Sequence, residues 1–277
     1  MGRRVTAGLA RGVRFTHIVD RAYRRFDRLR SALVVAFASD RFFDEYNALA
    51  YGVTATYRPD SADFRRGLFD WEEQAVGRFF PPPPARVLVG GAGGGREAFA
   101  LLDKGYTVVA FDPAEALVQA MSSQNPSGSR LRAYCGDYGT LPVLAGPSGQ
   151  PGVNLRDELP FDAAVVGWAS FSHLRNDHER VRTLQRFAEL TRGPILVSYF
   201  ADPASSKVSP PVGGVKGWVK RRLARRGTSV FSVQIGYYRL LGHEEMDDLV
   251  SRSGLNVLGT DRNANWPYLV VAGVGHD

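Results

Sequence analysis

The sequence predicts an α/β fold: a doubly wound, mostly parallel sheet of seven strands, preceded by a helical cap. From residue 86 onward, short apolar strands alternate with helices. A glycine-rich loop separates the first strand from the first helix of this series. Four consecutive prolines, residues 81–84, set this region apart from an N-terminal part with helical apolar spacing. Such an alternation is typical of a parallel sheet with helices on both faces.

The N-terminal part is predicted to be helical. Apolar residues recur at three-four spacing over residues 13–38, which indicates an amphipathic helix. Residues 40–57 are rich in aromatic side chains, and residues 58–61 then break the pattern. A further helix is predicted over residues 62–79, with a capping residue just before it. We therefore expect residues 1–80 to form a helical cap and substrate lid.

The remainder is predicted to form one Rossmann-like domain over residues 85–277. Its seven strands are predicted from short apolar runs at residues 86–89, 106–111, 131–135, 161–168, 194–200, 256–260 and 268–274. Helices are predicted at residues 96–104, 113–123, 177–191 and 244–253, and residues 145–160 are predicted as loop. Residues 201–241 interrupt the alternation after the fifth strand. We expect this insertion to form a second cap segment.

Composition excludes several classes of protein. The chain of 277 residues has one cysteine, Cys135, so an intrachain disulfide framework and a cysteine-based zinc site are excluded. The five histidines show no ligand spacing, so no metal site is expected. No apolar run approaches the ~20 residues of a membrane span, and no secretory signal is recognisable. A cytoplasmic location is expected, without stable membrane insertion.

The net charge of +7 is unevenly distributed. Residues 1–30 hold nine Arg and two Asp, and residues 207–226 hold three Lys and four Arg without an acid. Each segment therefore carries +7, and the rest of the chain carries −7. The basic segments are compatible with contact to an anionic partner such as nucleic acid, a membrane surface or an acyl carrier. They are equally compatible with solvated helix faces, and residues 215–226 with either a surface-binding helix or a cap over a pocket.

One motif carries the chemistry. Gly91, Gly93 and Gly95 follow the first predicted strand and open a helix, in the spacing G-x-G-x-G. Glycines at such a turn let a ligand approach the backbone, and the free N–H groups of the helix start suit a polar ligand group. Asp112 ends the next strand, where an acid can accept hydrogen bonds from ribose hydroxyls. These features predict a nucleoside-containing cofactor.

Four segments together resemble class I S-adenosylmethionine-dependent methyltransferases of the small-molecule type. Residues 86–97 resemble motif I, residues 112–113 motif II, residues 136–138 motif III and residues 161–166 motif IV of that superfamily. The resemblance covers roughly residues 85–200 and a hairpin at 255–274. It implies S-adenosyl-L-methionine as cofactor and S-adenosyl-L-homocysteine as product. The cofactor-binding residues it implies are Gly91, Ala92, Gly93, Gly95, Glu97, Asp112, Pro113, Asp137, Tyr138, Gly167 and Trp168.

The sequence departs from the family pattern at Val89. Members usually carry an acid there, two residues before the first motif glycine, which reaches toward the methionine part of the cofactor. In this chain the ammonium group needs another partner. Backbone carbonyls near Gly91 and the carboxylate of Glu97 are the two candidates.

Residues for the acceptor side follow from the same resemblance. His173 and Ser170 come after motif IV, where superfamily members place acceptor-facing residues, and Tyr199 ends the fifth predicted strand. His173 and Tyr199 are the candidate catalytic residues, as a base or an orienting group. Tyr46, Tyr51 and Trp71 of the N-terminal part, with Ser170, are candidates for binding the acceptor. Each of these aromatic residues is also compatible with ordinary core packing.

The leading hypothesis is a methyltransferase acting on the oxygen, nitrogen or carbon of a small molecule, with secondary metabolism suggested by the resemblance alone. Methyl transfer is an in-line displacement that needs alignment more than acid–base power. Methylation of RNA or protein is a second hypothesis, although no nucleic-acid-binding module is recognisable. A third is a protein that binds the cofactor without transferring a methyl group. The acceptor and the oligomeric state are not indicated by the sequence.

Overall fold

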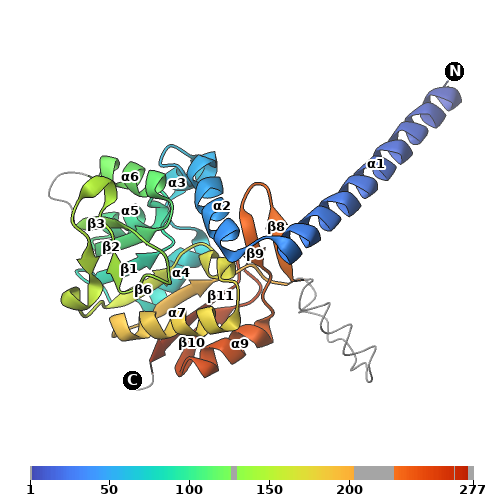
Figure 1. Cartoon of the computed structure of the whole chain (residues 1–277). Helices are drawn as coiled ribbons and strands as arrows, with labels where there is room; N and C mark the ends of the chain where they lie inside the picture. The colour runs from blue at the N-terminus through green and yellow to red at the C-terminus, as the bar shows by residue number, and fades with distance from the viewer. Residues whose placement is uncertain (1, 126–129, 203–227, 265, 274–277) are drawn as a thin grey trace.

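A seven-stranded sheet forms the centre of the molecule in the computed structural model, which describes residues 2–125, 130–202, 228–264 and 266–273, with side chains from residue 15 onward (Figure 1). The strand order is β10-β11-β7-β6-β1-β2-β3. The strands are β1 (Arg86–Gly90), β2 (Thr107–Asp112), β3 (Leu131–Cys135), β6 (Ala163–Val166), β7 (Ile195–Ser198), β10 (Leu255–Asp261) and β11 (Tyr268–Gly273). All neighbouring pairs are parallel except β11 with β7 and β10. The predicted fold class is confirmed.

Helices cover both faces of the sheet. They are α4 (Asp70–Phe79), α5 (Arg96–Asp103), α6 (Glu115–Gln124), α7 (Asp177–Leu190) and α9 (His243–Arg252). Alternate residues of a strand point to opposite faces, which is why Leu88 packs in the cluster containing α7 and α9. Val87 and Val89 pack in the other cluster, with α4 and α5. Every strand residue from Val87 to Gly90 is buried, as expected for a sheet covered on two sides.

The topology places a binding site at the carboxyl end of β1. The chain runs from β1 to β2 and β3 in one direction, and β6 and β7 lie on the other side of β1. At such a reversal the connections leave toward opposite faces and open a crevice beyond the strand ends.

The N-terminal part consists of helices, as predicted. They are α1 (Gly2–Phe37), α2 (Asp40–Val53), the 3-10 turn η1 (Ala55–Tyr57), α3 (Ala62–Arg66) and α4. α1 extends away from the body as a single long rod, while α2 lies against the body (Figure 1). The single helix predicted over residues 62–79 is wrong: Gly67 has a φ of +73°, which ends α3, and α4 starts three residues later.

The predicted insertion contains a hairpin of β8 (Ser229–Ser232) and β9 (Gly236–Arg239). The basic segment 207–226, including the predicted amphipathic stretch 215–226, lies outside the described residues. The predicted loop 145–160 includes one strand of a short antiparallel pair, β4 (Val143–Leu144) with β5 (Val153–Asn154), and two 3-10 turns, η2 (Pro147–Gly149) and η3 (Leu155–Glu158).

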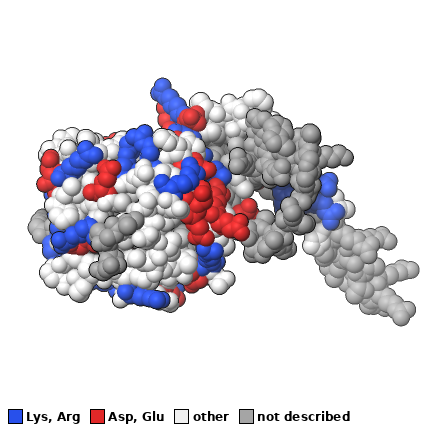
Figure 2. Space-filling view, turned by 90° about the horizontal axis from the view of Figure 1, so that it is seen from below, with Lys and Arg blue, Asp and Glu red and all other residues white. Residues whose placement is uncertain are grey.

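The surface is mixed in charge. Basic and acidic side chains both occur on the face shown in Figure 2, and neither sign covers it. The net charge of +7 is therefore not the charge of a uniformly basic domain. None of the described helices is long and apolar enough to cross a bilayer.

Candidate functional site

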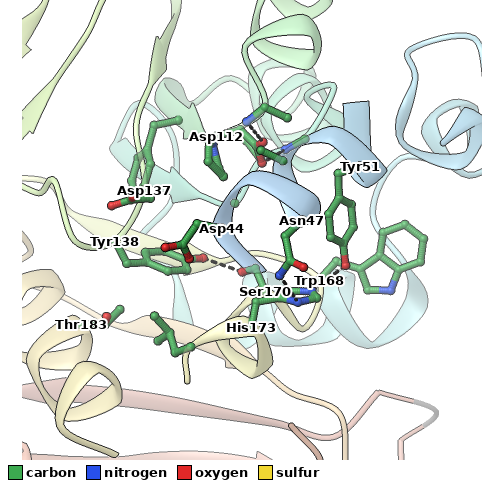
Figure 3. Close-up of a pocket in the computed structure, with 18 of the residues that line it drawn as sticks. Asp44, Asn47, Tyr51, Asp112, Asp137, Tyr138, Trp168, Ser170, His173 and Thr183 are labelled. Carbon is green, nitrogen blue, oxygen red and sulfur yellow. Dashed lines mark hydrogen bonds between the residues drawn. The ribbon is translucent and has the colours of Figure 1, made fainter. Parts of the chain in front are cut away.

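A cavity of about 380 Å³ opens at the carboxyl ends of β1, β2, β3 and β6. We call two sides of it the floor and the lid. The floor consists of the glycine loop, residues 91–95, with Asp112, Pro113, Asp137 and Tyr138. The lid consists of α2 and η1 with His173, which ends the 3-10 turn η4 (Ser170–His173). The β8–β9 hairpin holds the lid from behind and does not itself line the cavity. The predicted site residues that line the cavity are Tyr51, Gly91, Ala92, Gly93, Glu97, Asp112, Pro113, Asp137, Tyr138, Trp168, Ser170 and His173 (Figure 3).

The glycine loop has a backbone that only glycine adopts readily. Gly91, Gly93 and Gly95 have φ values of +66°, +56° and +100°. A Cβ atom on Gly91 would lie 2.7 Å from the Oγ atom of Ser170 and 2.9 Å from the Tyr138 hydroxyl. A side chain is therefore excluded at Gly91 both by conformation and by space.

Asp112 is fixed by the backbone of this floor. Its Oδ2 atom accepts the Gly93 N–H at 2.8 Å and its Oδ1 atom accepts the Ala114 N–H at 2.9 Å. Burial raises the pKa of Asp112 to about 6, against the opposite effect of these two backbone N–H donors. Each carboxylate oxygen keeps a lone pair for a ligand, so the group is suited to accept two hydroxyl protons.

Two further floor residues differ in exposure. The Asp137 side chain is exposed, and its Oδ1 atom accepts the Thr140 N–H at 2.8 Å. Tyr138 is buried against the rings of Phe111 and Phe187, and its hydroxyl shares a hydrogen bond of 2.5 Å with the Ser170 hydroxyl. Ser170 is thereby tied to the floor rather than to the lid.

A buried ionic cluster joins the glycine loop to α4. The Arg96 guanidinium donates to both carboxylate oxygens of Glu72, at 2.6 and 2.7 Å, and to Glu97 at 2.7 Å. It also lies over the Phe69 ring, 4.1 Å from the centroid. Burial raises the pKa of Glu72 to about 7. Two carboxylates share one guanidinium, so the cluster has a net negative charge only where Glu72 is ionised, above a pH of about 7.

This cluster brings a carboxylate to the cavity, whereas Val89 offers none. The Val89 side chain is fully buried in the apolar core, so it contributes no polar group to the site. Glu97 is the carboxylate of the cluster that lines the cavity. The sequence identified Glu97 but not its partners Glu72 and Arg96. The only available signal was that all three are charged residues on predicted helices.

His173 is bound on both ring nitrogens. Its Nδ1 atom lies 2.6 Å from the Tyr237 carbonyl oxygen, and its Nε2 atom lies 2.5 Å from the Tyr51 hydroxyl (Figure 3). A carbonyl can only accept, so Nδ1 carries the proton and Nε2 accepts the proton of Tyr51. Burial lowers the pKa of His173 to about 4, so the ring is neutral at neutral pH. Burial also raises the pKa of Tyr51 well above 10.

Asn47 fastens this pair to the hairpin. Its side-chain amide donates to the Tyr237 carbonyl at 3.1 Å, and its Oδ1 atom accepts the Tyr237 N–H at 2.8 Å. The Asn47 side chain thus joins α2 to β9 through both backbone polar groups of Tyr237. No local pattern indicated Asn47, because its partner is 190 residues away.

The aromatic rings near the glycine loop form a connected group. Tyr57 lies 4.5 Å from the Tyr51 ring and 5.5 Å from the Trp168 ring, measured between centroids. The Tyr57 carbonyl accepts the Gly94 N–H at 3.1 Å, so η1 lies directly over the loop. Tyr57 was not predicted as a site residue.

Several predicted residues lie elsewhere. Tyr46 donates to the Val233 carbonyl at 2.9 Å, Trp71 stacks on Tyr268 in the core, and the Tyr199 hydroxyl is hydrogen-bonded to His243 Nδ1 at 2.7 Å. None of the three lines the cavity.

Gly95 and Gly167 support the floor without lining the cavity. A Cβ atom on Gly95 would lie 2.8 Å from the Met121 sulfur, and one on Gly167 would lie 3.0 Å from the Gly91 carbonyl oxygen. Both residues let neighbouring elements pack closely. In the described part of the chain, no group of three or more His, Cys, Asp or Glu side chains is arranged to hold a metal ion.

No protein-family model matches the sequence, and no curated protein matches it. Several solved structures, however, are similar to this chain. The CcbJ methyltransferase from Streptomyces caelestis is 16% identical, covers 81% of this chain and 98% of its own, and gives a TM-score of 0.54. The glycopeptide N-methyltransferase MtfA, solved with S-adenosyl-L-methionine, is 17% identical over 78% of this chain and 89% of its own, with a TM-score of 0.52. An S-adenosylmethionine-dependent methyltransferase from Clostridium acetobutylicum is 11% identical over 91% and 99%, with a TM-score of 0.51. At these identities the comparisons establish the class I methyltransferase fold.

Proposed function

We propose that this chain is an S-adenosylmethionine-dependent methyltransferase that acts on an oxygen, nitrogen or carbon atom of a small molecule. One observation carries the proposal. The glycine loop and Asp112, which suit a nucleoside cofactor, share a single cavity with the polar pair Tyr51–His173 of the lid. The cavity is within the ~300–1,000 Å³ typical of small-molecule sites. The lack of a membrane-spanning helix among the described residues and the single cysteine accord with a cytoplasmic enzyme.

The floor fits the proposed cofactor. Asp112 would hold the ribose hydroxyls, Asp137 the adenine amine, and the loop around Gly91 and Gly93 the methionine part. The Glu97 carboxylate, which lines the cavity, would accept the ammonium group there, in place of an acid at Val89. Bound S-adenosylmethionine supplies an electrophilic methyl group. The floor's part is to hold that group in line with the acceptor.

The lid presents a hydrogen-bond acceptor to the cavity. Because Tyr51 gives its proton to His173, its oxygen has only lone pairs left for a ligand. Such an oxygen would bind an O–H or N–H group of the acceptor and orient the reacting atom. Tyr51 is the proposed catalytic residue, and His173, which is neutral and acts through Tyr51, is the positioning residue.

The solved structures support this proposal. MtfA is described as a glycopeptide N-methyltransferase in complex with S-adenosylmethionine. The structure from Clostridium acetobutylicum is described as S-adenosylmethionine-dependent. Both share the fold in which this floor and lid meet.

Titration calorimetry with S-adenosylmethionine and S-adenosylhomocysteine tests the cofactor. We expect micromolar binding of both, about −8 kcal/mol. Transfer of a labelled methyl group to pools of small hydroxyl and amino compounds then tests the reaction. Transfer to tRNA or to protein instead would show that the acceptor is a macromolecule and not a small molecule. Binding without transfer to any acceptor would support a non-catalytic role, and absence of binding to both compounds would refute the proposal.

A further inference from the structure

Half of the large hydrophobic side chains that are exposed in the described part of the chain lie on one face of α1. Eight large side chains of this helix are exposed, with exposed fractions from 49% for Leu33 to 83% for Phe37. They are Phe15, Ile18, Val19, Tyr23, Phe26, Leu29, Leu33 and Phe37. At 100° per residue they fall within an arc of about 140° and extend over ~33 Å. We call them the apolar face of α1. Contiguous apolar surfaces of this size mark interaction sites.

This face points away from the body. Ser31, Val34 and Val35 hold α1 to the hairpin, where Ser31 accepts the Phe231 N–H at 2.8 Å. On the helical wheel these residues are centred about 140° from the apolar face. Figure 1 shows the rod of α1 projecting from the body on the side of β8. A flat surface can therefore meet the apolar face while the body lies on the opposite side of the helix.

The charges beside the apolar face select the partner. Residues 15–37 contain five Arg and two Asp, a net charge of +3. The two acids are already paired within the helix, Asp20 with Arg24 and Asp27 with Arg30, both at 2.5 Å. Arg25 borders the apolar face and Arg30 lies near its other edge, while the remaining three arginines lie on the opposite side of the helix. Long arginine side chains at such a border can keep their charge in a headgroup layer. The arrangement is that of a helix lying in the interface of an anionic membrane.

A second copy of the helix is a poorer match. The seam between two copies would follow Phe15, Val19, Ala22, Phe26, Leu29 and Leu33, which have alternating spacings of four and three residues. The positions beside that seam carry Arg25 and Arg30 and no acid. Pairing would bring like charges together, whereas an anionic surface neutralises them.

We propose that α1 docks the enzyme onto anionic membrane surfaces, with its apolar face in the headgroup–acyl boundary and its arginines on the lipid phosphates. This goes beyond the proposed methyl transfer and does not depend on it. The implied arrangement keeps the catalytic body outside the bilayer, close to acceptors that collect at the membrane.

Vesicle flotation of the full chain tests the proposal. We expect binding to vesicles containing phosphatidylglycerol, little binding to phosphatidylcholine alone, and loss of binding at high salt. The double variant Val19→Ser/Phe26→Ser should bind about tenfold or more weakly. The matched control Val143→Ser/Val257→Ser removes two exposed apolar side chains from the body, 59% and 43% exposed, and should bind like the parent.

Other outcomes would overturn the proposal. Equal flotation of the parent and of the Val19→Ser/Phe26→Ser variant would show that α1 is not the membrane contact. A dimer in light scattering that Val19→Ser/Phe26→Ser converts to a monomer, without flotation, would identify a second copy as the partner. Binding to tRNA without flotation would identify a nucleic acid. Circular dichroism confirms the folding of each variant. All variants should retain cofactor binding in calorimetry, which separates a failure of membrane binding from a failure of the proposed function.

Discussion

The floor and the lid of the cavity are held by different kinds of interaction. The floor comes from one continuous stretch, residues 86–138, and its key contacts are backbone N–H groups on Asp112. The lid is held by side chains far apart in the sequence, with Tyr51 and His173 separated by 122 positions and Asn47 and Tyr237 by 190. The floor therefore follows from the strand-loop-helix motif, whereas the lid exists only after the chain has folded.

The largest expected effect concerns the ionic cluster that joins the glycine loop of the floor to α4. Arg96→Met leaves Glu72 and Glu97 buried without a counter-ion, because the guanidinium is their shared partner. We expect a loss of about 3–5 kcal/mol in the free energy of unfolding, measured by urea denaturation. Lys104→Met is the control, since its ion pair with Glu73 is largely exposed and contributes at most ~1 kcal/mol. Equal losses in both variants would mean that the cluster does not join α4 to the loop.

The second effect isolates the floor. Asp112→Asn removes the charge that we propose for the ribose hydroxyls. We expect the affinity for S-adenosylmethionine to fall about 100-fold, close to 2.7 kcal/mol, by calorimetry. Asp103→Asn on the exposed end of α5 should bind as the parent does. An unchanged affinity in Asp112→Asn would remove Asp112 from the cofactor site.

The third effect isolates the lid. Tyr51→Phe removes the hydroxyl that faces the cavity, so kcat should fall roughly 10–100-fold with unchanged cofactor affinity. His173→Gln should have a smaller effect in the same direction, because an amide can still accept the Tyr51 proton. Tyr46→Phe is the matched control: Tyr46 is also a lid tyrosine, but its hydroxyl donates to the Val233 carbonyl. A loss of cofactor affinity in Tyr51→Phe would place Tyr51 on the cofactor side instead.

The fourth effect is a pH dependence that we assign to Asp112 of the floor, and Glu72, whose pKa burial raises to about 7, is the other group that titrates nearby. Burial raises the pKa of Asp112 to about 6, so in the free protein this carboxyl becomes protonated as the pH falls below 6. The ionised form is the better hydrogen-bond acceptor, so cofactor affinity should be full above about pH 7, be halved near pH 6 and be about tenfold below its full value at pH 5. His173, with a pKa lowered to about 4, is neutral in this range. Asp112→Asn should abolish the dependence, and its persistence there would assign it to another group.

The sequence predicted the floor well and the lid poorly, for physical reasons. Strand periodicity and glycine spacing are local, so they located the seven strands, the loop and Asp112. Tyr46, Tyr51 and Trp71 had the same aromatic character in the sequence, and only Tyr51 lines the cavity. Which aromatic side chain points inward depends on how α2 packs on the hairpin. That packing depends on Asn47 and Tyr237, whose contact no local pattern encodes.

The break at Gly67 shows the same limit on a smaller scale. Apolar spacing continued through residues 62–79 and predicted one helix, but a glycine at positive φ ends α3. Gly67 also brings its carbonyl to Arg96 at 2.7 Å. The break therefore helps to seat the ionic cluster beside the loop, a role that depends on a residue 29 positions away.

The smallest expected effect concerns Tyr199, which the sequence grouped with His173 as a catalytic candidate. Its hydroxyl is bonded to His243 Nδ1, and its ring is buried in the core that contains α7 and α9. Tyr199→Phe should therefore lower the free energy of unfolding by only about 1 kcal/mol, in urea denaturation, and leave kcat and KM unchanged. A fall in kcat comparable to that of Tyr51→Phe, without loss of stability, would contradict this assignment. It would mean that the reacting centre extends past the lid to the end of β7, and that the division into floor and lid omits a third side.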